Sequence, residues 1–512
     1  MKKLIPFKKR IISKNNKIGS TFIVLLLFLL AHTVLQAQQY VQIGNDIDGQ
    51  ITSEASGLAT SLSHDGSRIA VGSNFMGNNG LSPGLVRVYE LDGGTWTQVG
   101  ADIVGENMDD EFGTSVHLNH DGTVVVIGAP ENDDAADTAG MVRVYELIGG
   151  QWSQMGQDID GVDVNERFGY SVDISFDGSR IIAGSLFGRT NGVITGDARV
   201  YEFSNGSWSQ LGDDLGSTTQ DNYGRSVAMN APGTRVAVAG PLNDTGGFNL
   251  GKTEIFELDN GVWTQMGATI FGTEESGASG WSISLNEAGN AIAIGAPANG
   301  DPIVQGAAKV YQFSGGDWNQ LGTTIAGTNP ISAFADSVSL SDDGARVVVG
   351  DPLQGPNGLT RVFSLSAGTW TQIGPDIVGE AQGDLSGRSV SISADGLRIS
   401  MGANVNSDGA PGGGQARVFE DTLLSVDDVN GTGIAIYVLP NPARNFITIQ
   451  SQSNITFEGI SLYDMQGRLV SQVEETAINN ETRLDVSHIA AGNYLIRIKT
   501  AQGEQNLKLI KN

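Results

Sequence analysis

The chain has 512 residues, no cysteine and a formal net charge of −27. The absence of cysteine excludes disulfides, thiol catalysis and thiolate metal sites. The acidic balance argues against nucleic acid and anionic membrane surfaces as partners. Seventy glycines are typical of a fold built from tight turns, and the length provides for a large core without disulfide bonds.

The first 37 residues have the composition of a secretory signal peptide. They carry seven basic side chains and no acidic one, with a ten-residue apolar run at 22–31 and Leu-Gln-Ala at 35–37. This run is too short to span a bilayer comfortably, so cleavage is favoured over the alternative of an uncleaved anchor helix. Removal of residues 1–37 would leave 23 basic and 57 acidic side chains, a net charge of −34.

A unit of about 56 residues recurs along the chain and is clearest at 112–156. Its four runs of alternating apolar residues predict strands, and the joints at 119–122 and 148–150 have the Gly and Asp chemistry of hairpin turns. Because four antiparallel strands cannot bury both faces alone, the unit predicts one blade of a β-propeller. The predicted strands are residues 115–119, 123–129, 141–147 and 151–156.

The repeats predict seven blades and indicate how the ring closes. Residues 40–44 (Tyr-Val-Gln-Ile-Gly) match 96–100, 56 residues further on, whereas the seventh unit has no such strand after Glu420. We therefore expect residues 40–44 to complete the last blade, which removes an open sheet edge. A hairpin glycine marks each of the seven units, at Gly66, Gly122, Gly178, Gly233, Gly289, Gly344 and Gly396. A fourth-strand tryptophan marks six units, at Trp96, Trp152, Trp208, Trp263, Trp318 and Trp370.

Two motifs recur inside the units and are interpreted as structural. The first strand repeats Gly-x-Ser, as in Gly113 and Ser115. We expect it on the inner wall of the ring, where crowding demands small residues. The third strand repeats a cation, which we expect to lie on the neighbouring tryptophan or to pair with a carboxylate of the blade. These cations are Arg87, Arg143, Arg199, Lys309, Arg361 and Arg417.

The phrases Phe112-Gly113 and Gly128-Ala129-Pro130, the second repeated at 295–297, resemble the FG-GAP repeats of integrin-type propellers. That resemblance implies the propeller fold and, in many such repeats, a calcium loop of the form D-x-D-x-D-G. The corresponding turns here, such as residues 63–66 (Ser-His-Asp-Gly), are too short and too poor in oxygen ligands to enclose the ion.

The loops after the second strand and those between units vary in sequence, and we expect both sets on one face of the ring. Binding sites often lie in loops held by a rigid scaffold. Six carboxylates there could gather a cation between the first two units, for which calcium is the fitting ion. The alternative is a solvated acidic rim that keeps an exported protein soluble. The candidates are Glu106, Asp109, Asp110, Glu111, Asp133 and Asp134.

No motif indicates catalysis, so no catalytic or cofactor-binding residue is assigned. The sequence contains no glycine-rich phosphate loop, no HExxH and no nucleophile elbow. The repeat region has three histidines, His64, His117 and His120, and none recurs beside the repeated serines. A carboxylate pair for glycoside cleavage remains open, since acidic residues are abundant and their separations depend on the fold.

The C-terminal residues 434–512 resemble the type A sorting domain of the type IX secretion system of Bacteroidetes-like bacteria. The resemblance rests on Leu439–Ala443 (LPNPA), Leu462–Val470 (LYDMQGRLV), Leu484–Ser487 (LDVS), and Lys508–Lys511 (KLIK). It implies delivery across the outer membrane by the type IX machinery, removal of the domain and attachment to lipopolysaccharide. Its motif positions are Pro440, Asn441, Pro442, Gly467, Arg468, Gly492, Tyr494 and Lys511.

The predicted organisation is all-β throughout. Residues 1–37 form a signal peptide, 38–420 a seven-bladed β-propeller closed by its N-terminal strand, 421–433 a polar linker and 434–512 a small Ig-like β-sandwich. An ordinary Ig-like binding domain is the alternative for the last segment.

We expect a monomer, exported through the periplasm to the cell surface or the medium. There it would act as a binding or adhesion module for a glycan or a surface protein, with no nucleic-acid partner. The alternatives are a polysaccharide-processing enzyme with its site on the loop face and a scaffold without a ligand pocket.

Overall fold

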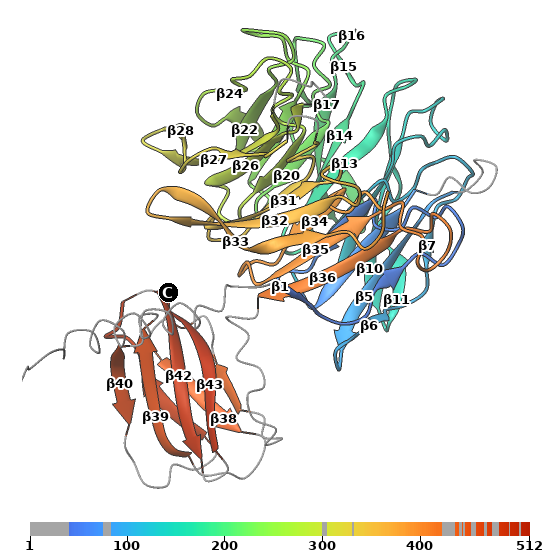
Figure 1. Cartoon of the computed structure of the whole chain (residues 1–512). Helices are drawn as coiled ribbons and strands as arrows, with labels where there is room; N and C mark the ends of the chain where they lie inside the picture. The colour runs from blue at the N-terminus through green and yellow to red at the C-terminus, as the bar shows by residue number, and fades with distance from the viewer. Residues whose placement is uncertain are drawn as a thin grey trace, which may run out of the picture.

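The computed structural model describes residues 40–74, 83–298, 305–329 and 332–421, together with much of the C-terminal part. There it covers residues 436–439, 443, 446–451, 457–464, 468–473, 481–490, 492–500 and 503–511. All regular elements in these ranges are β-strands (Figure 1), and none of the described segments is a helix long and apolar enough to cross a bilayer. The expected signal peptide and residues 422–433 of the expected linker lie outside the described residues, while Asp421, predicted as the first linker residue, belongs to the last strand of the ring.

The described part of the repeat region folds into seven antiparallel sheets of four or five strands and one two-stranded ribbon, with strands and tight turns alternating as the sequence predicts. In the second sheet, β8 (Ser115–Leu118), β9 (Val124–Ala129), β10 (Met141–Ile148) and β11 (Gln151–Gln154) agree with the predicted runs to within two residues. A short extra strand that the sequence analysis missed, β12 (Ile159–Asp160), pairs with the free part of β10. The fold therefore uses one further short strand per sheet in most of the ring.

The other sheets repeat this order of strands. The first has β3 (Ala59–Leu62), β4 (Arg68–Ser73), β5 (Leu85–Asp92), β6 (Thr95–Gln98) and β7 (Ile103–Val104); the third has β13 (Phe168–Ile174), β14 (Arg180–Ser185), β17 (Asp197–Ser204), β18 (Ser207–Gln210) and β19 (Leu215–Gly216), with the ribbon β15 (Arg189–Thr190) and β16 (Val193–Ile194) beside it. The fourth has β20 (Ser226–Met229), β21 (Arg235–Gly240), β22 (Lys252–Asp259), β23 (Val262–Gln265) and β24 (Ile270–Phe271).

The fifth sheet has β25 (Ser282–Leu285), β26 (Ala291–Ala296), β27 (Ala307–Ser314), β28 (Asp317–Gln320) and β29 (Ile325–Ala326); the sixth has β30 (Val338–Leu340), β31 (Arg346–Asp351), β32 (Leu359–Ser366) and β33 (Thr369–Val378). The seventh has β34 (Ser389–Ile392), β35 (Arg398–Ala403) and β36 (Gln415–Asp421), completed by β1 (Tyr40–Gln42) and β2 (Ile47–Asp48).

The first strands of the sheets form the inner wall of a closed ring. Each of β3, β8, β13, β20, β25, β30 and β34 packs against the next, and β34 packs against β3. The serine of Gly-x-Ser crosses to the neighbouring sheet: Ser115 Oγ donates a hydrogen bond to the carbonyl of Gly169 at 2.8 Å, and Ser389 Oγ to Gly57 at 2.9 Å. This contact confirms that these serines have a structural role.

The N-terminal strand closes the ring as predicted. Tyr40, Val41 and Gln42 pair antiparallel with Asp421, Glu420 and Phe419 at the end of β36, and Figure 1 shows β1 along that strand. Elsewhere each fourth-strand tryptophan donates its indole N–H to a carbonyl of the preceding sheet, as Trp152 does to Val99 at 2.9 Å. Trp96 donates in the same way to Ile43 at 3.0 Å.

The C-terminal part forms a separate all-β unit of two antiparallel sheets around one core. One sheet has β37 (Ile436–Leu439), β38 (Phe446–Ser451) and β41 (Glu481–Asp485), and the other has β40 (Leu469–Val473), β39 (Phe457–Asp464), β42 (Gly492–Thr500) and β43 (Gly503–Lys511). Buried side chains from both sheets, including Ile447, Ile460 and Ile496, pack into a single cluster.

Of the sorting-motif positions in this unit, Pro440, Asn441, Pro442 and Gly467 lie outside the described residues, and Arg468 is described. Tyr494 is buried, and its hydroxyl donates a hydrogen bond to the carbonyl of Ala490 at 2.8 Å. Lys511 pairs with Gly492 at the end of the β42–β43 ladder.

Candidate functional site

The variable loops meet on one face of the ring, as the sequence predicts. Asn107, in the loop between the first two units, donates its side-chain N–H to Asp134 at 3.1 Å. Asn132, in the loop after β9, donates in turn to Asp110 at 3.1 Å and to Asp134 at 3.2 Å. The two loop sets are therefore joined by side-chain hydrogen bonds, and we call this side of the ring the loop face.

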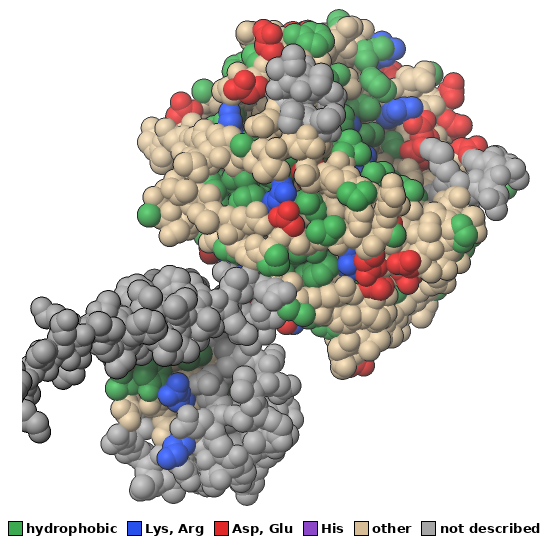
Figure 2. All heavy atoms as spheres, viewed as in Figure 1, with side chains coloured by type: hydrophobic (Ala, Val, Ile, Leu, Met, Phe, Trp, Pro, Cys, Tyr) green, Lys and Arg blue, Asp and Glu red, His purple; other side chains and the backbone are tan. Residues whose placement is uncertain are grey.

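The other acidic candidates do not share the contacts of Asp110 and Asp134. Glu106 forms an ion pair with Arg143 at 2.8 Å, and Asp133 accepts the backbone N–H of Thr138 at 2.6 Å. Asp109 is exposed and has a left-handed backbone with φ of 70°. Figure 2 shows acidic side chains on the displayed face in several small clusters. The structure thus brings Asp110 and Asp134 together around an amide and spreads the other candidates.

The hydrogen bond from the Asn132 amide to Asp110 recurs in other units. In each of three units an asparagine after the second strand donates to a buried aspartate that precedes the first strand. Because the same pair recurs with amide and carboxylate matched, its simplest role is to hold the two loops together. The pairs are Asn132–Asp110 at 3.1 Å, Asn243–Asp221 at 3.0 Å and Asn406–Asp384 at 3.2 Å.

Calcium binding at these carboxylates remains a prediction, as does the alternative of a solvated acidic rim. Since the oxygens of Asp110, Asp133 and Asp134 already accept N–H groups, we expect millimolar calcium to raise the melting temperature of the mature protein by less than about 1 °C. Differential scanning calorimetry with and without calcium measures this. A rise of several degrees that disappears in the double variant Asp109→Asn with Asp110→Asn would instead establish the metal site.

The five third-strand arginines pair with carboxylates, whereas Lys309 Nζ donates to the hydroxyl of Thr273 at 2.7 Å. Arg143 Nη2 lies 2.7 Å from Asp158, and Arg361 Nε lies 2.8 Å from Asp376, while Arg199 forms a fully buried ion pair with Glu166. The expected tryptophan partner is wrong, because the tryptophans lie one strand further out and bond to the preceding sheet. Three of these arginines, Arg199, Arg361 and Arg417, lie over a phenylalanine ring, and Arg199 is 5.3 Å from the ring centre of Phe168.

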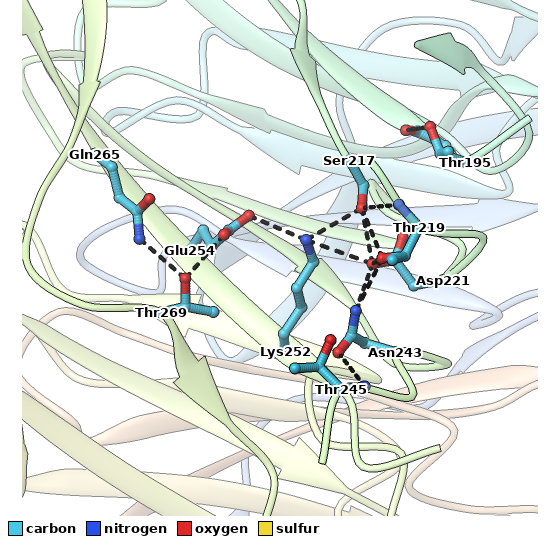
Figure 3. Close-up of polar contacts among 11 residues, drawn as sticks. Thr195, Ser217, Thr219, Asp221, Asn243, Thr245, Lys252, Glu254, Gln265 and Thr269 are labelled. Atoms are coloured by element: carbon cyan, nitrogen blue, oxygen red, sulfur yellow. Dashed lines mark hydrogen bonds and ion pairs between the residues drawn. The ribbon is translucent and has the colours of Figure 1, made fainter. Parts of the chain in front are cut away.

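The fourth sheet reverses the charges of this motif (Figure 3). Where the third sheet has Asp197 and Arg199, the fourth has Lys252 and Glu254 at the same positions. Lys252 Nζ lies 3.4 Å from Asp221 and 3.4 Å from Glu254. Because both charges are exchanged, a cation and carboxylates still pair within this sheet. The position that holds the third-strand cation in the other units therefore holds Glu254 here.

The middle residue of the Gly-x-Ser motif, and of its variants Gly57-Leu58-Ala59 and Ala335-Asp336-Ser337, varies between units, with arginine in two of the seven. These residues surround the mouth of the channel on the loop face. The mouth is a cavity of about 380 Å³. Packing of the first strand does not require this residue to vary while its neighbours stay constant, so the variable position is a candidate for ligand recognition. The seven residues are Leu58, Thr114, Tyr170, Arg225, Trp281, Asp336 and Arg388.

Arg225 lies between two aromatic rings at the mouth. Its guanidinium carbon is 3.4 Å from the ring centre of Trp281 and 5.3 Å from that of Tyr170. Its Nη1 donates to the Tyr170 hydroxyl at 2.6 Å, whereas its Nε is buried without a protein partner. Cation–π contact fixes the plane of the guanidinium, and its Nε–H has no acceptor within the described part of the protein.

Asp336 links the stack to a second arginine. It accepts the indole N–H of Trp281 at 2.9 Å and forms a close ion pair with Arg388. Glu111 lines the same mouth, where burial and then the charge of Glu131 raise the pKa of its carboxyl. The mouth therefore combines two aromatic rings, two guanidinium groups and two carboxyl groups. Sequence analysis named Glu111 but missed the others, although the variable position inside a constant motif was a usable signal.

The hairpin tips that follow the first strands gather at the opposite end of the channel. His64 and His120 stack with ring centres 4.0 Å apart, and His120 stacks on Phe176 at 3.6 Å. His117 lies within the channel and pairs with Asp173. Burial by itself lowers the pKa of His117, but the charge and hydrogen bond of Asp173 outweigh it, so that the pKa is raised.

Comparison with known proteins identifies the C-terminal unit. Residues 436–512 match the family described as the secretion system C-terminal sorting domain, which confirms the type IX sorting assignment. The domain directs secretion to the cell surface or the extracellular space and implies interaction with the type IX machinery. No curated protein has a sequence that matches the chain. The FG-GAP resemblance remains a prediction.

Among solved structures, the chain is similar to a proposed 6-phosphogluconolactonase of Bacteroides uniformis, with 12% identity and a TM-score of 0.46 over 79% of this chain and 96% of the other. A periplasmic gluconolactonase of Pseudomonas aeruginosa gives 16% and 0.44 over 64% and 86%. A proposed 6-phosphogluconolactonase of Bacteroides fragilis gives 13% and 0.44 over 68% and 97%. At these TM-scores no property of those proteins is transferred to this chain.

Proposed function

We propose that the chain is an exported binding or adhesion module, a seven-bladed β-propeller followed by an Ig-like sorting sandwich, whose channel mouth recognises an anionic glycan. After translocation the sorting domain is removed and the propeller is attached to lipopolysaccharide or released. The observation that carries the proposal is the stack of Arg225 between Tyr170 and Trp281, beside the Asp336–Arg388 pair.

The chemistry of the mouth fits a sugar that bears a carboxylate. Guanidinium groups bind carboxylates with paired N–H donors, and the buried Nε of Arg225 lacks a protein acceptor. Aromatic faces favour the apolar side of a pyranose ring. Because Arg388 is already paired with Asp336, Arg225 is the guanidinium group of the mouth that would bind the anion.

Binding of acidic oligosaccharides tests this directly. We expect the mature protein to bind uronate-containing glycans on an array, and we expect Arg225→Gln to weaken that binding about tenfold or more, a loss of about 1.4 kcal/mol. Arg189→Gln is the matched control, because it removes an exposed arginine from a loop-face segment outside the mouth. Equal binding by both variants and the unchanged protein would reject the mouth as the site.

The carboxyl groups of the mouth favour a second candidate, the polysaccharide-processing enzyme. Burial and Glu131 raise the pKa of Glu111, while Asp336 is paired with Arg388. Carboxyl groups in such different environments are suited to acid and base roles in glycoside cleavage. Incubating the bound glycans with the protein and with Glu111→Gln distinguishes the two functions. Products that require Glu111 indicate an enzyme, and intact glycans indicate a binding module.

A further inference from the structure

We propose that the channel end opposite the loop face binds a divalent transition-metal ion, of which zinc is the best example, through His64, Glu287 and Asp342. The three residues belong to the hairpin tips of the first, fifth and sixth sheets. Among the described residues they form the one group of three metal-ligating side chains close enough to share an ion. The site is separate from the mouth and does not depend on the glycan proposal.

The backbone holds these tips in a ring. His64 N–H donates to the carbonyl of His120 at 2.9 Å, and Ala394 N–H donates to the carbonyl of His64 at 2.9 Å. Asp342 N–H donates to Ala394 at 3.0 Å, and Ala231 N–H donates to Glu287 at 3.0 Å. Most neighbouring tips are thus joined by main-chain hydrogen bonds, and the side-chain amide of Asn286 joins the fifth tip to the carbonyl of Asp342 at 3.0 Å. These bonds hold the backbone from which the ligands extend.

The ligand atoms already converge. His64 Nε2 lies 2.9 Å from Asp342 Oδ2, and the ligand atoms of His64, Glu287 and Asp342 all lie within 4.8 Å of one another. Ligands about 2.0–2.2 Å from a tetrahedral zinc ion are about 3.4 Å apart. Small side-chain rotations of the exposed Glu287 would therefore complete the site without moving the backbone.

The tips around the site position the imidazole. Ala394, at the tip of the seventh sheet, lies between Asp342 and His64 in the hydrogen-bonded ring. Its methyl group is small, so the side chains of Asp342 and His64 can meet across it. On the other side His120 stacks on the His64 ring at 4.0 Å and is itself backed by Phe176 at 3.6 Å. Stacking on one side and a small residue on the other leave the His64 ring facing the carboxylates.

The charges also favour a cation. The carboxyl groups of Glu287 and Asp342 lie close to each other and to the imidazole of His64. Two negative charges at this separation repel each other. A divalent cation bound between the two carboxylates would attract both of them and so offset their mutual repulsion. An imidazole nitrogen favours zinc or a similar transition metal over calcium or magnesium, which prefer oxygen ligands alone. Three protein ligands leave one position open toward the adjoining channel cavity of about 290 Å³.

Zinc binding to the untagged mature protein tests the proposal. Isothermal titration with zinc should show one ion per chain, and Glu287→Gln should weaken the affinity about tenfold or more because a charged ligand is lost. Glu287 is exposed, so this variant is expected to fold. Asp109→Asn, an equal charge change at an exposed loop-face position, is the control and should bind zinc like the unchanged protein. Cobalt(II) should give visible d–d bands that are lost with His64→Gln.

Three results would overturn the proposal. They are the absence of zinc binding by the folded protein, equal affinity in Glu287→Gln and the unchanged protein, and an affinity reduced only in Asp109→Asn. The last would place the ion among the loop-face carboxylates. Shifts of the His64 ring resonances on zinc addition, with those of His117 unchanged, would support the assignment independently of affinity.

Discussion

Deletion of residues 40–44 is expected to lower the free energy of unfolding by about 5 kcal/mol or more and to promote aggregation. The deletion removes β1 from the edge of β36 and takes away the carbonyl of Ile43, which accepts the indole N–H of Trp96. The last sheet then has an open edge, and the first sheet loses one of the hydrogen bonds that join it to the seventh. Calorimetry and light scattering of the mature protein measure both effects.

Point variants on β1 separate packing from polar bonding. Tyr40 is 6% exposed, and its hydroxyl donates to Gly396 at 2.7 Å and accepts from Arg346 at 3.1 Å. We expect Tyr40→Ala to cost about 3–5 kcal/mol through the cavity it leaves. Tyr40→Phe should cost about 1–3 kcal/mol because Arg346 loses an acceptor in a largely buried site.

The adjacent residue of the same strand is the control. Val41 is 43% exposed, so Val41→Ala should change the free energy of unfolding by less than about 0.5 kcal/mol. An unchanged melting curve for the deletion would show that another segment closes the ring. A cost for Val41→Ala equal to that for Tyr40→Ala would assign the effect to strand propensity and not to packing of the phenol.

Removal of the sorting domain is expected to abolish delivery to the surface. A chain ending at Gly433 lacks residues 436–512, which match the sorting family, but keeps all seven sheets of the ring. Because the two parts have separate cores, we expect the shortened chain to fold and to accumulate in the periplasm. The full chain should reach the surface or the medium and lose about ten kilodaltons, the mass of about 80 residues, in maturation.

Cell fractionation with an antibody to the propeller decides this prediction. Protease resistance of the periplasmic form provides the folding control, since a misfolded chain would be degraded. Tyr494→Ala in the full chain tests the domain more finely, because this buried tyrosine holds Ala490 through its hydroxyl. Surface delivery of the chain that ends at Gly433 would contradict the role of the C-terminal unit as the export signal.

Local patterns determined the strands and the closure. Period-two alternation with Gly and Asp turns located β8 to β11 to within two residues, because such patterns depend only on neighbours in sequence. The match between residues 40–44 and 96–100 located the closing strand for the same reason, since both segments accept the same cross-sheet bond from a tryptophan. The short extra strands such as β12 were missed, because two residues carry no detectable period.

Tertiary structure alone decided the sites. Arg225, Trp281 and Asp336 are about 55 residues apart in sequence, and only closure of the ring places them around one mouth. His64, Glu287 and Asp342 converge for the same reason, since each occupies the same place in its repeat. The sequence determined an exported, repetitive all-β chain with a sorting domain. Which side chains meet depended on the rotation that relates one unit to the next, and this rotation results from packing between units and not from any single repeat.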